Sequence, residues 1–226
     1  MGPWKNTILV SKNTIPSGTG VAARIAAETL ARRGRDYTPE VRRILDAALE
    51  IIGQNGTTSR ARVTDIVAAA GLNNDAFYRH FPSKDALVTA LIEDGTERLT
   101  SYLSHQMAKE STPEGKVRRW VEGVLSQTNE ETAAVTLAVL GNRTTLAGGI
   151  TGDGHDASAA FAALLHEPFA ALGSTNPEMD ASLVAHAAVG KMTDYLSAGK
   201  RPTRAELDHI TRFCIDAAAP LKQVRS

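Results

Sequence analysis

The chain has 226 residues, of which 42% are hydrophobic and 22% charged, a composition typical of a soluble protein with one or two cores. No apolar run approaches the ~20 residues that span a bilayer, and the N-terminus lacks the apolar segment of a signal peptide. The single cysteine, Cys214, excludes an intrachain disulfide and fits a reducing compartment, so we expect a cytoplasmic protein. The net charge is zero, but residues 1–90 carry 12 basic and 8 acidic side chains, whereas residues 91–226 carry 13 and 17. A difference of this size is modest, so it can support a motif in the N-terminal part that contacts phosphates but does not predict such contact alone.

The first elements are an arm over residues 1–16 and a helix over residues 17–35. The helix has a weak apolar stripe of Val21, Ile25 and Leu30. From Met1 to Arg43 the chain carries eight basic and three acidic side chains. Two interpretations stay open: a basic arm that contacts DNA, or a solvated helix that packs on its own domain or on a second copy.

The next helix is predicted to begin at Thr38-Pro39-Glu40, which supplies an N-cap, a proline in the first turn and an early acid. Its apolar residues recur at helical spacing, and Asn55-Gly56 ends it. The core positions are Val41, Ile44, Leu45, Ala48, Ile51 and Ile52.

Two short helices around a tight turn are predicted between residues 63 and 80. Val63, Ile66, Val67 and Ala70 form one apolar face, and Gly71 ends that helix. Asn73 caps a second helix over residues 74–80, in which Phe77 is the inward anchor and Asn74, Ala76, Tyr78 and Arg79 are available to face outward. Pro82 ends it, and Ser83 caps the following helix, with Lys84 in its first turn. This pattern is typical of a helix-turn-helix, which places one helix in the major groove of DNA.

The rest of the chain is predicted to be helical, without strands, giving about nine or ten helices in all. Small residues line one face of each of the last two helices, which indicates either an internal core face or a contact with a second copy. These residues are Ala181, Ala185, Ala188, Val189 and Met192, then Ile210, Phe213, Cys214 and Ala217. The predicted helices cover residues 84–108, 113–125, 130–146, 157–172, 177–196 and 203–219.

The run AGLNNDAFYRHFPSKDAL resembles the DNA-binding domain of the tetracycline-repressor (TetR) family, over Thr38 to about Leu91. The likeness lies in the Ala-Gly turn, the Tyr-x-His-Phe run and the lysine that opens the next helix. Many members have Ser-x-Gly-Thr-Leu-Tyr where this chain has Asn73 to Tyr78. The resemblance implies an all-α fold: a three-helix DNA-binding head at residues 38–90 and a ligand-binding and dimerisation body at 91–226. Residues 1–37 form the arm and an extra N-terminal helix.

The candidate DNA contacts follow from the chemistry of base edges and phosphates. Asn74 can pair with adenine, Ala76 can touch a thymine methyl, and Tyr78 can reach a phosphate or a thymine methyl. Arg79, His80 and Lys84 are expected phosphate contacts, the last at a helix N-terminus and matching the family's phosphate-binding lysine. The full set is Arg62, Thr64, Asn73, Asn74, Ala76, Tyr78, Arg79, His80 and Lys84.

The body is expected to hold an effector, because members of the family have a mostly apolar cavity there. An ordinary core is the alternative for each lining residue, and no cofactor or metal is expected. The candidates are Trp120, Val124, Leu140, Arg143, Phe161, Leu165, Phe169, Met192 and Tyr195.

The resemblance implies a ligand-responsive DNA-binding regulator that represses as a homodimer on a palindromic operator. The dimer would form through the last two helices, and a small apolar effector would release the DNA. An activator of the same fold, or a helical interaction module that does not bind DNA, stays an alternative. The chain has no G-x-S-x-G, phosphate-binding glycine loop or H-E-x-x-H, so we do not expect an enzyme.

Overall fold

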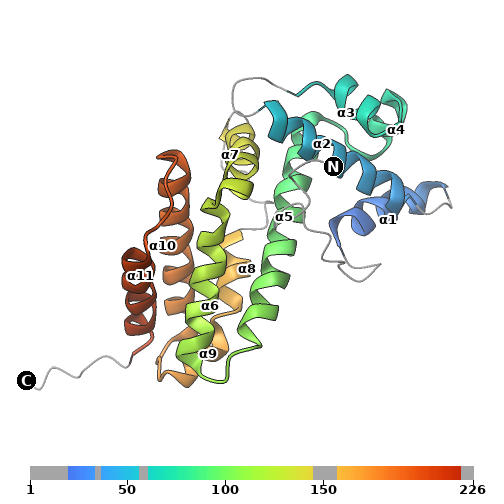
Figure 1. Ribbon diagram of the computed structural model, residues 1–226. Helices are drawn as coiled ribbons and strands as arrows, with labels where there is room; N and C mark the ends of the chain where they lie inside the picture. Colours follow the sequence, from blue (N-terminus) through green and yellow to red (C-terminus); the bar gives the residue numbers. More distant parts are fainter. Residues whose placement is uncertain (1–19, 34–36, 56–60, 145–156, 220–226) are drawn as a thin grey trace, which may run out of the picture. The chain divides into compact units, whose positions relative to one another are not determined.

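The computed structural model describes residues 20–33, 37–55, 61–144 and 157–219 (Figure 1). Within these ranges the chain forms eleven α-helices, a short 3-10 turn at Ser126–Thr128 and no strand. None of the described helices is both long and apolar enough to cross a membrane. The helices are α1 (Val21–Arg33), α2 (Thr38–Asn55), α3 (Val63–Ala69), α4 (Asn74–His80), α5 (Lys84–Met107), α6 (Pro113–Leu125), α7 (Glu130–Thr144), α8 (Ala157–Ala163), α9 (His166–Ala171), α10 (Pro177–Ser197) and α11 (Arg204–Ala217).

Helix starts lie where the caps predict them. The side chains of Thr112 and Asn176 accept hydrogen bonds from the first turns of α6 and α10, each of which has a proline at its start. Thr203 and Glu206 form a reciprocal capping box on α11. These local hydrogen bonds satisfy backbone donors that a helix end leaves without partners, which is why the starts are predictable.

The helix predicted over residues 157–172 is wrong in one respect, because it is divided into α8 and α9. Pro168 has no backbone N–H, and its ring would clash with the carbonyl of Leu164 in a continuous helix. The chain therefore makes a tighter turn, with the Leu165 N–H donating to the Ala162 carbonyl at 2.8 Å. Phe169 then donates to Leu165 and restarts the helix.

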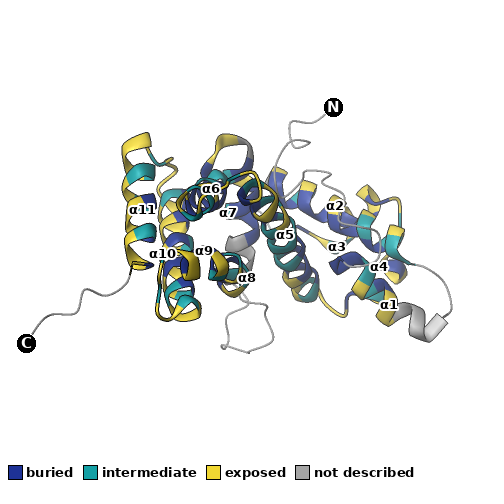
Figure 2. Cartoon of the chain, turned by 90° about the horizontal axis from the view of Figure 1, so that it is seen from below, coloured by how far each residue is buried: buried dark blue, intermediate teal, exposed yellow. Residues whose placement is uncertain are grey.

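One compact unit comprises α1–α4, α5 as far as Arg98, and α7. Its core brings together large apolar side chains that the periodicity predicts to face inward, including Ile44, Ile66, Phe77 and Leu87. Figure 2 shows the corresponding buried faces of α2 and α5. The apolar area removed from water is the main force that holds these short helices together.

The helix α7 packs against α2 in this unit, although the predicted division placed residues 130–146 in the body. Val135 of α7 is buried, and a Cβ atom added to Gly53 of α2 would lie 3.0 Å from Val135 Cγ2. A glycine therefore allows the close approach of two helices that are about 80 residues apart in sequence.

The helix α1 packs on its own unit, against α2, and also contacts α4. The backbone N–H of Val21 donates to Glu97 Oε2 at 3.1 Å, and Arg24 forms an ion pair with Glu93. Packing on its own domain, one of the two interpretations of this segment, is therefore observed for α1. The arm at residues 1–16 lies outside the described residues.

The second unit comprises α5 from Leu99 onward, α6 and α8–α11. The predicted small-residue faces of its last two helices are mainly internal: Ala181, Ala185, Ala188 and Cys214 are each at most 2% exposed. Phe213 and Ala217 are exceptions that are exposed, Phe213 to 55%. For most of this set, the intrachain alternative therefore holds.

Candidate nucleic-acid interface

The turn between α3 and α4 has the geometry that a helix-turn-helix requires. Gly71 has a φ of +65°, a conformation that glycine adopts without the steric cost of a side chain. The Leu72 N–H donates to the Val67 carbonyl at 2.8 Å, and the Gly71 N–H donates to Ala68 at 3.1 Å. These two bonds close the end of α3 and direct the chain into α4.

The start of α4 is held by Asn73, whose Oδ1 accepts a hydrogen bond from the Ala76 N–H at 2.9 Å. Asn73 therefore acts as the N-cap, and its side-chain oxygen is engaged with the protein backbone. Asp75 lies in the first turn, where the positive end of the helix dipole stabilises a carboxylate.

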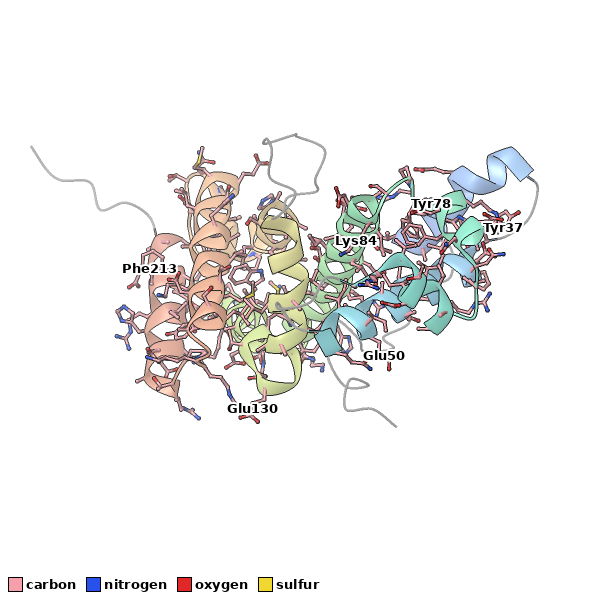
Figure 3. The ribbon with its side chains drawn as sticks, turned by 90° about the horizontal axis from the view of Figure 1, so that it is seen from above. Tyr37, Glu50, Tyr78, Lys84, Glu130 and Phe213 are labelled. Carbon is pink, nitrogen blue, oxygen red and sulfur yellow. The ribbon has the colours of Figure 1, made fainter. Side chains whose placement is uncertain are left out.

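An exposed polar and aromatic surface follows α3 and α4. Tyr78 is 57% exposed, an unusual exposure for a large aromatic ring, and Asn74 is exposed one turn before it. Arg62 and Thr64 are exposed at the start of α3. Lys84 lies in the first turn of α5, where the capping Ser83 Oγ accepts from the Ala86 N–H at 3.1 Å (Figure 3).

Ala76 does not face outward as predicted, because it is 4% exposed. It lies one position before Phe77, which is fully buried and packs against Phe81 with ring centroids 5.5 Å apart. The inward face of this seven-residue helix is thus wide enough to include both residues. Helical periodicity alone does not show how far around a short helix the core extends.

Arg79 and His80 are engaged within the protein rather than presented to solvent. Arg79 Nη1 donates to Glu40 Oε1 at 2.7 Å, and His80 Nε2 lies 2.7 Å from the same oxygen. The His80 side chain has no exposed surface. The expectation that both side chains point toward phosphates is therefore not met, and Glu40 and Tyr37 are neighbours that sequence reasoning missed. No local signal links α2 and α4 across about 40 residues.

Six of the predicted effector-site residues are buried in the core of the second unit, on α6, α8, α9, α10 and the α8–α9 turn. Trp120 of α6 donates from its indole Nε1 to the Phe161 carbonyl at 3.0 Å, so this polar atom is satisfied. Tyr195 is partly buried and is hydrogen-bonded to Glu206 of α11; burial, followed by this bond, raises its pKa. The side chains of Leu140 and Arg143 lie outside the described part of the chain. The six buried residues are Trp120, Val124, Phe161, Leu165, Phe169 and Met192.

Comparisons with known proteins agree with this geometry. Residues 44–91 match the model of the family "Bacterial regulatory proteins, tetR family". The nucleoid occlusion factor SlmA of Actinobacillus pleuropneumoniae is 29% identical over 75 residues, which cover 33% of this chain and 37% of that protein. An uncharacterized HTH-type transcriptional regulator of Bacillus subtilis, YvdT, is 42% identical over 52 residues, 23% of this chain and 26% of that protein. These matches therefore span 37% and 26% of the relatives' length.

The overall fold has a wider likeness. A solved structure from work on the control of antibiotic production by bacterial hormones aligns with a TM-score of 0.54 and 19% identity. The alignment covers 78% of this chain and 94% of that one, so it concerns the helical architecture of both units. The helix-turn-helix at residues 44–91 is therefore similar to that of the tetR family of bacterial regulatory proteins, and the helical fold of the chain is similar to that solved structure.

Proposed function

We propose that the protein regulates transcription by binding DNA through α4. The observation that carries this proposal is the exposed surface of Asn74 and Tyr78 on the second helix of a helix-turn-helix, beside Lys84 at the start of α5. A helix of this kind enters the major groove with its N-terminal residues at the base edges. An exposed tyrosine has no role in the core, and it suits a surface that becomes covered by DNA.

The individual roles follow from the chemistry of each group. The Asn74 amide can donate to and accept from adenine at once, and Tyr78 can contact a thymine methyl or a phosphate. Lys84 and the N-terminus of α5 would bind a DNA phosphate together, and Arg62 and Thr64 would contact the neighbouring DNA backbone. Phosphate contacts set the register of the protein on DNA, while base contacts choose the sequence.

The test is selection of bound sequences from a random duplex pool, with the wild type and the variants Tyr78→Ala and Lys84→Ala. We expect one palindromic sequence to be enriched by the wild type and lost, or bound at least about tenfold more weakly, in both variants. Lys200→Ala is the matched control, because Lys200 is an exposed lysine in the other unit. No enrichment by the wild type at low salt would contradict the proposal and favour a helical interaction module.

A second copy of the chain is the proposed partner of α10 and α11. Met179, Leu183 and Phe213 are 55%, 63% and 55% exposed, which is high for large apolar side chains. Leu183, Ala187 and Gly190 recur at helical spacing on α10, and a Cβ added to Gly190 would meet nothing within 4 Å. Small residues beside large apolar ones allow two helices to approach closely, as in a symmetric dimer.

The oligomeric state of Leu183→Arg tests this interface by sedimentation equilibrium. Placing a charge on the apolar face is expected to yield a monomer that keeps its helical content. Ser104→Arg adds the same side chain at an exposed position of α5 and should leave the mass unchanged. A wild type that is monomeric at micromolar concentration, or a dimeric Leu183→Arg, would count against this surface.

We further propose that a small apolar effector binds among the helices of the second unit and lowers operator affinity. The apolar character of Trp120, Phe161 and Phe169 supports this ligand class. Two copies of α4 would read half-sites about one DNA turn, ~34–36 Å, apart, and a ligand that prefers another spacing would release the DNA. Whether binding represses or activates depends on where the operator lies.

Titration of the DNA-bound protein with a medium-chain fatty acid and with its acyl-CoA thioester tests the ligand class. A compound that binds is expected to lower operator affinity by about 5–150-fold, the usual range of such coupling. Phe169→Ala should weaken the response to the compound more than it weakens DNA binding. Unchanged DNA affinity across a wide panel of apolar ligands would contradict this part of the proposal.

A further inference from the structure

The last turn of α4 is held by a single carboxylate oxygen of α2. Glu40 Oε1 accepts a hydrogen bond from Arg79 Nη1 at 2.7 Å and lies 2.7 Å from His80 Nε2. Since an ionised carboxylate only accepts hydrogen bonds, the hydrogen between Glu40 and His80 lies on Nε2. Two neighbouring side chains of α4 therefore converge on one atom at the start of α2.

An aromatic ring completes this cluster. The rings of Tyr37 and His80 meet edge to face, with centroids 5.3 Å apart and an interplanar angle of 63°. The Arg79 Cζ atom lies 5.4 Å from the centroid of Tyr37, within the range of a cation–π contact. The guanidinium is thus held by both a carboxylate and a ring, which restricts its freedom to turn toward a ligand.

The cluster is largely withdrawn from water. The side chains of His80, Glu40 and Arg79 are 0%, 19% and 25% exposed, so their attraction is less screened than that of surface pairs. The helix α4 has seven residues and is too short to be stable alone, so tertiary contacts decide its direction. Phe77 anchors its apolar face, and Glu40 anchors its polar end.

We propose, on the basis that the protein binds DNA through α4, that Glu40 is a positioning residue for the recognition helix. In this arrangement Arg79 and His80 orient α4 through Glu40 and do not bind phosphates. The outward direction of Asn74 and Tyr78 depends on that orientation. Glu40 carries a negative charge near a polyanion, so its benefit to DNA binding can come only through position.

The direction in which Glu40→Ala changes operator affinity distinguishes a positioning role of Glu40 from a simple effect of its negative charge. If Glu40 positions α4, the variant binds its selected operator about tenfold more weakly, a loss of the size of one base contact. If Glu40 acts only as a nearby charge, the variant binds as tightly as the wild type or more tightly. Glu50→Ala removes the same group from an exposed position of α2 and should leave affinity within about twofold (Figure 3). Glu40→Gln keeps an oxygen acceptor and should recover part of the loss.

The salt dependence of binding tests the assignment of Arg79. The slope of log Kobs against log salt concentration is negative, and each phosphate contact increases its magnitude by about 0.9. We expect Lys84→Gln to reduce the slope by about 0.9 per half-site, whereas Arg79→Gln weakens binding and leaves the slope unchanged. A reduction by Arg79→Gln equal to that of Lys84→Gln would overturn the proposal and make Arg79 a phosphate contact.

A measurement on the protein without DNA tests whether Glu40 positions α4 independently of whether the protein binds DNA. Amide hydrogen exchange at Phe77 and Phe81 should be faster in Glu40→Ala than in the wild type, while exchange in α10 is unchanged. If Glu40→Ala does not fold, the same comparison is made with Glu40→Gln. Unaltered exchange together with unaltered affinity would refute the positioning role of Glu40 but not DNA binding through α4. A wild type that selects no DNA sequence would refute both proposals.

Discussion

The buried ion pairs that join α2 to α5 lead to a quantitative prediction about stability. Arg42 donates two hydrogen bonds to Asp94, at 3.0 and 2.9 Å, and Arg98 Nε forms an ion pair with Asp94 Oδ2 at 2.9 Å. The side chains of Asp94, Arg98 and Arg42 are 5%, 10% and 30% exposed. Burial opposes the charge of Arg42, but its hydrogen bonds to Asp94 and the charges of Asp94, Asp46 and Glu97 together raise the pKa of Arg42 above the ordinary value.

Replacing Asp94 with alanine removes the shared acceptor and leaves two guanidiniums partly buried. Breaking a buried pair in this way costs about 3–5 kcal/mol, mainly because the remaining charge loses its partner. Arg42 still reaches solvent, and Asp46 stays within 4.0 Å of Arg42 and 3.7 Å of Arg98. We therefore expect a loss of about 3 kcal/mol, at the lower end of that range.

Urea unfolding at a fixed protein concentration, followed by far-ultraviolet circular dichroism, measures this loss. The control is Glu122→Ala, which breaks an exposed pair with Arg119 whose two side chains are 40% and 46% exposed. That change should cost about 0.5 kcal/mol or less. If Asp94→Ala costs no more than Glu122→Ala, then burial does not strengthen this network and the reasoning is refuted.

Three further predictions concern the interior of each unit. Gly123→Ala would place a Cβ 2.3 Å from Cδ2 of the fully buried Leu103, so we expect overpacking to cost about 1–3 kcal/mol of stability, more than the ~1 kcal/mol gained in helix propensity. A variant that is more stable than the wild type in urea unfolding would contradict this. Burial raises the pKa of Cys214 to about 12, so the native thiol should react with iodoacetamide at pH 8 far more slowly than in denaturant, and equal rates would show that it is accessible. Burial also raises the pKa of Glu97, so the folded state keeps a proton that the unfolded chain has lost, and stability falls as pH rises from the ordinary to the raised value. Glu97→Gln should therefore be more stable than the wild type at pH 7 and lose that advantage below about pH 4; equal unfolding midpoints at pH 7 would argue against a desolvated carboxylate.

Helix boundaries were the most predictable part of this protein. The starts at Asn74, Pro177 and Arg204 follow from caps that act within three residues, and the turn at Gly71 follows from the conformational freedom of glycine. The helix-turn-helix was readable for the same reason, since its turn and caps form one continuous run. The break between α8 and α9 has an equally local cause, Pro168, which the helix predicted over residues 157–172 does not take into account.

Side-chain direction was less predictable where a helix is short. Periodicity places Phe77 in the core, but it does not show that Ala76 is buried beside it. The same limit applies to the last two helices. Their small residues were compatible with two packings, and only the positions of the neighbouring helices show that Ala181 and Ala185 are internal while Leu183 is exposed.

By itself, the sequence determined the all-helical class, the ends of most helices and the presence of a helix-turn-helix, because those features depend on hydrogen bonds and steric limits within about four residues. The tertiary structure decided which distant groups meet. Glu40 holds Arg79 and His80 from about 40 residues away, and Asp94 holds Arg42 from 52 residues away. Such pairs form only after apolar burial has brought the helices together, so no local pattern encodes them.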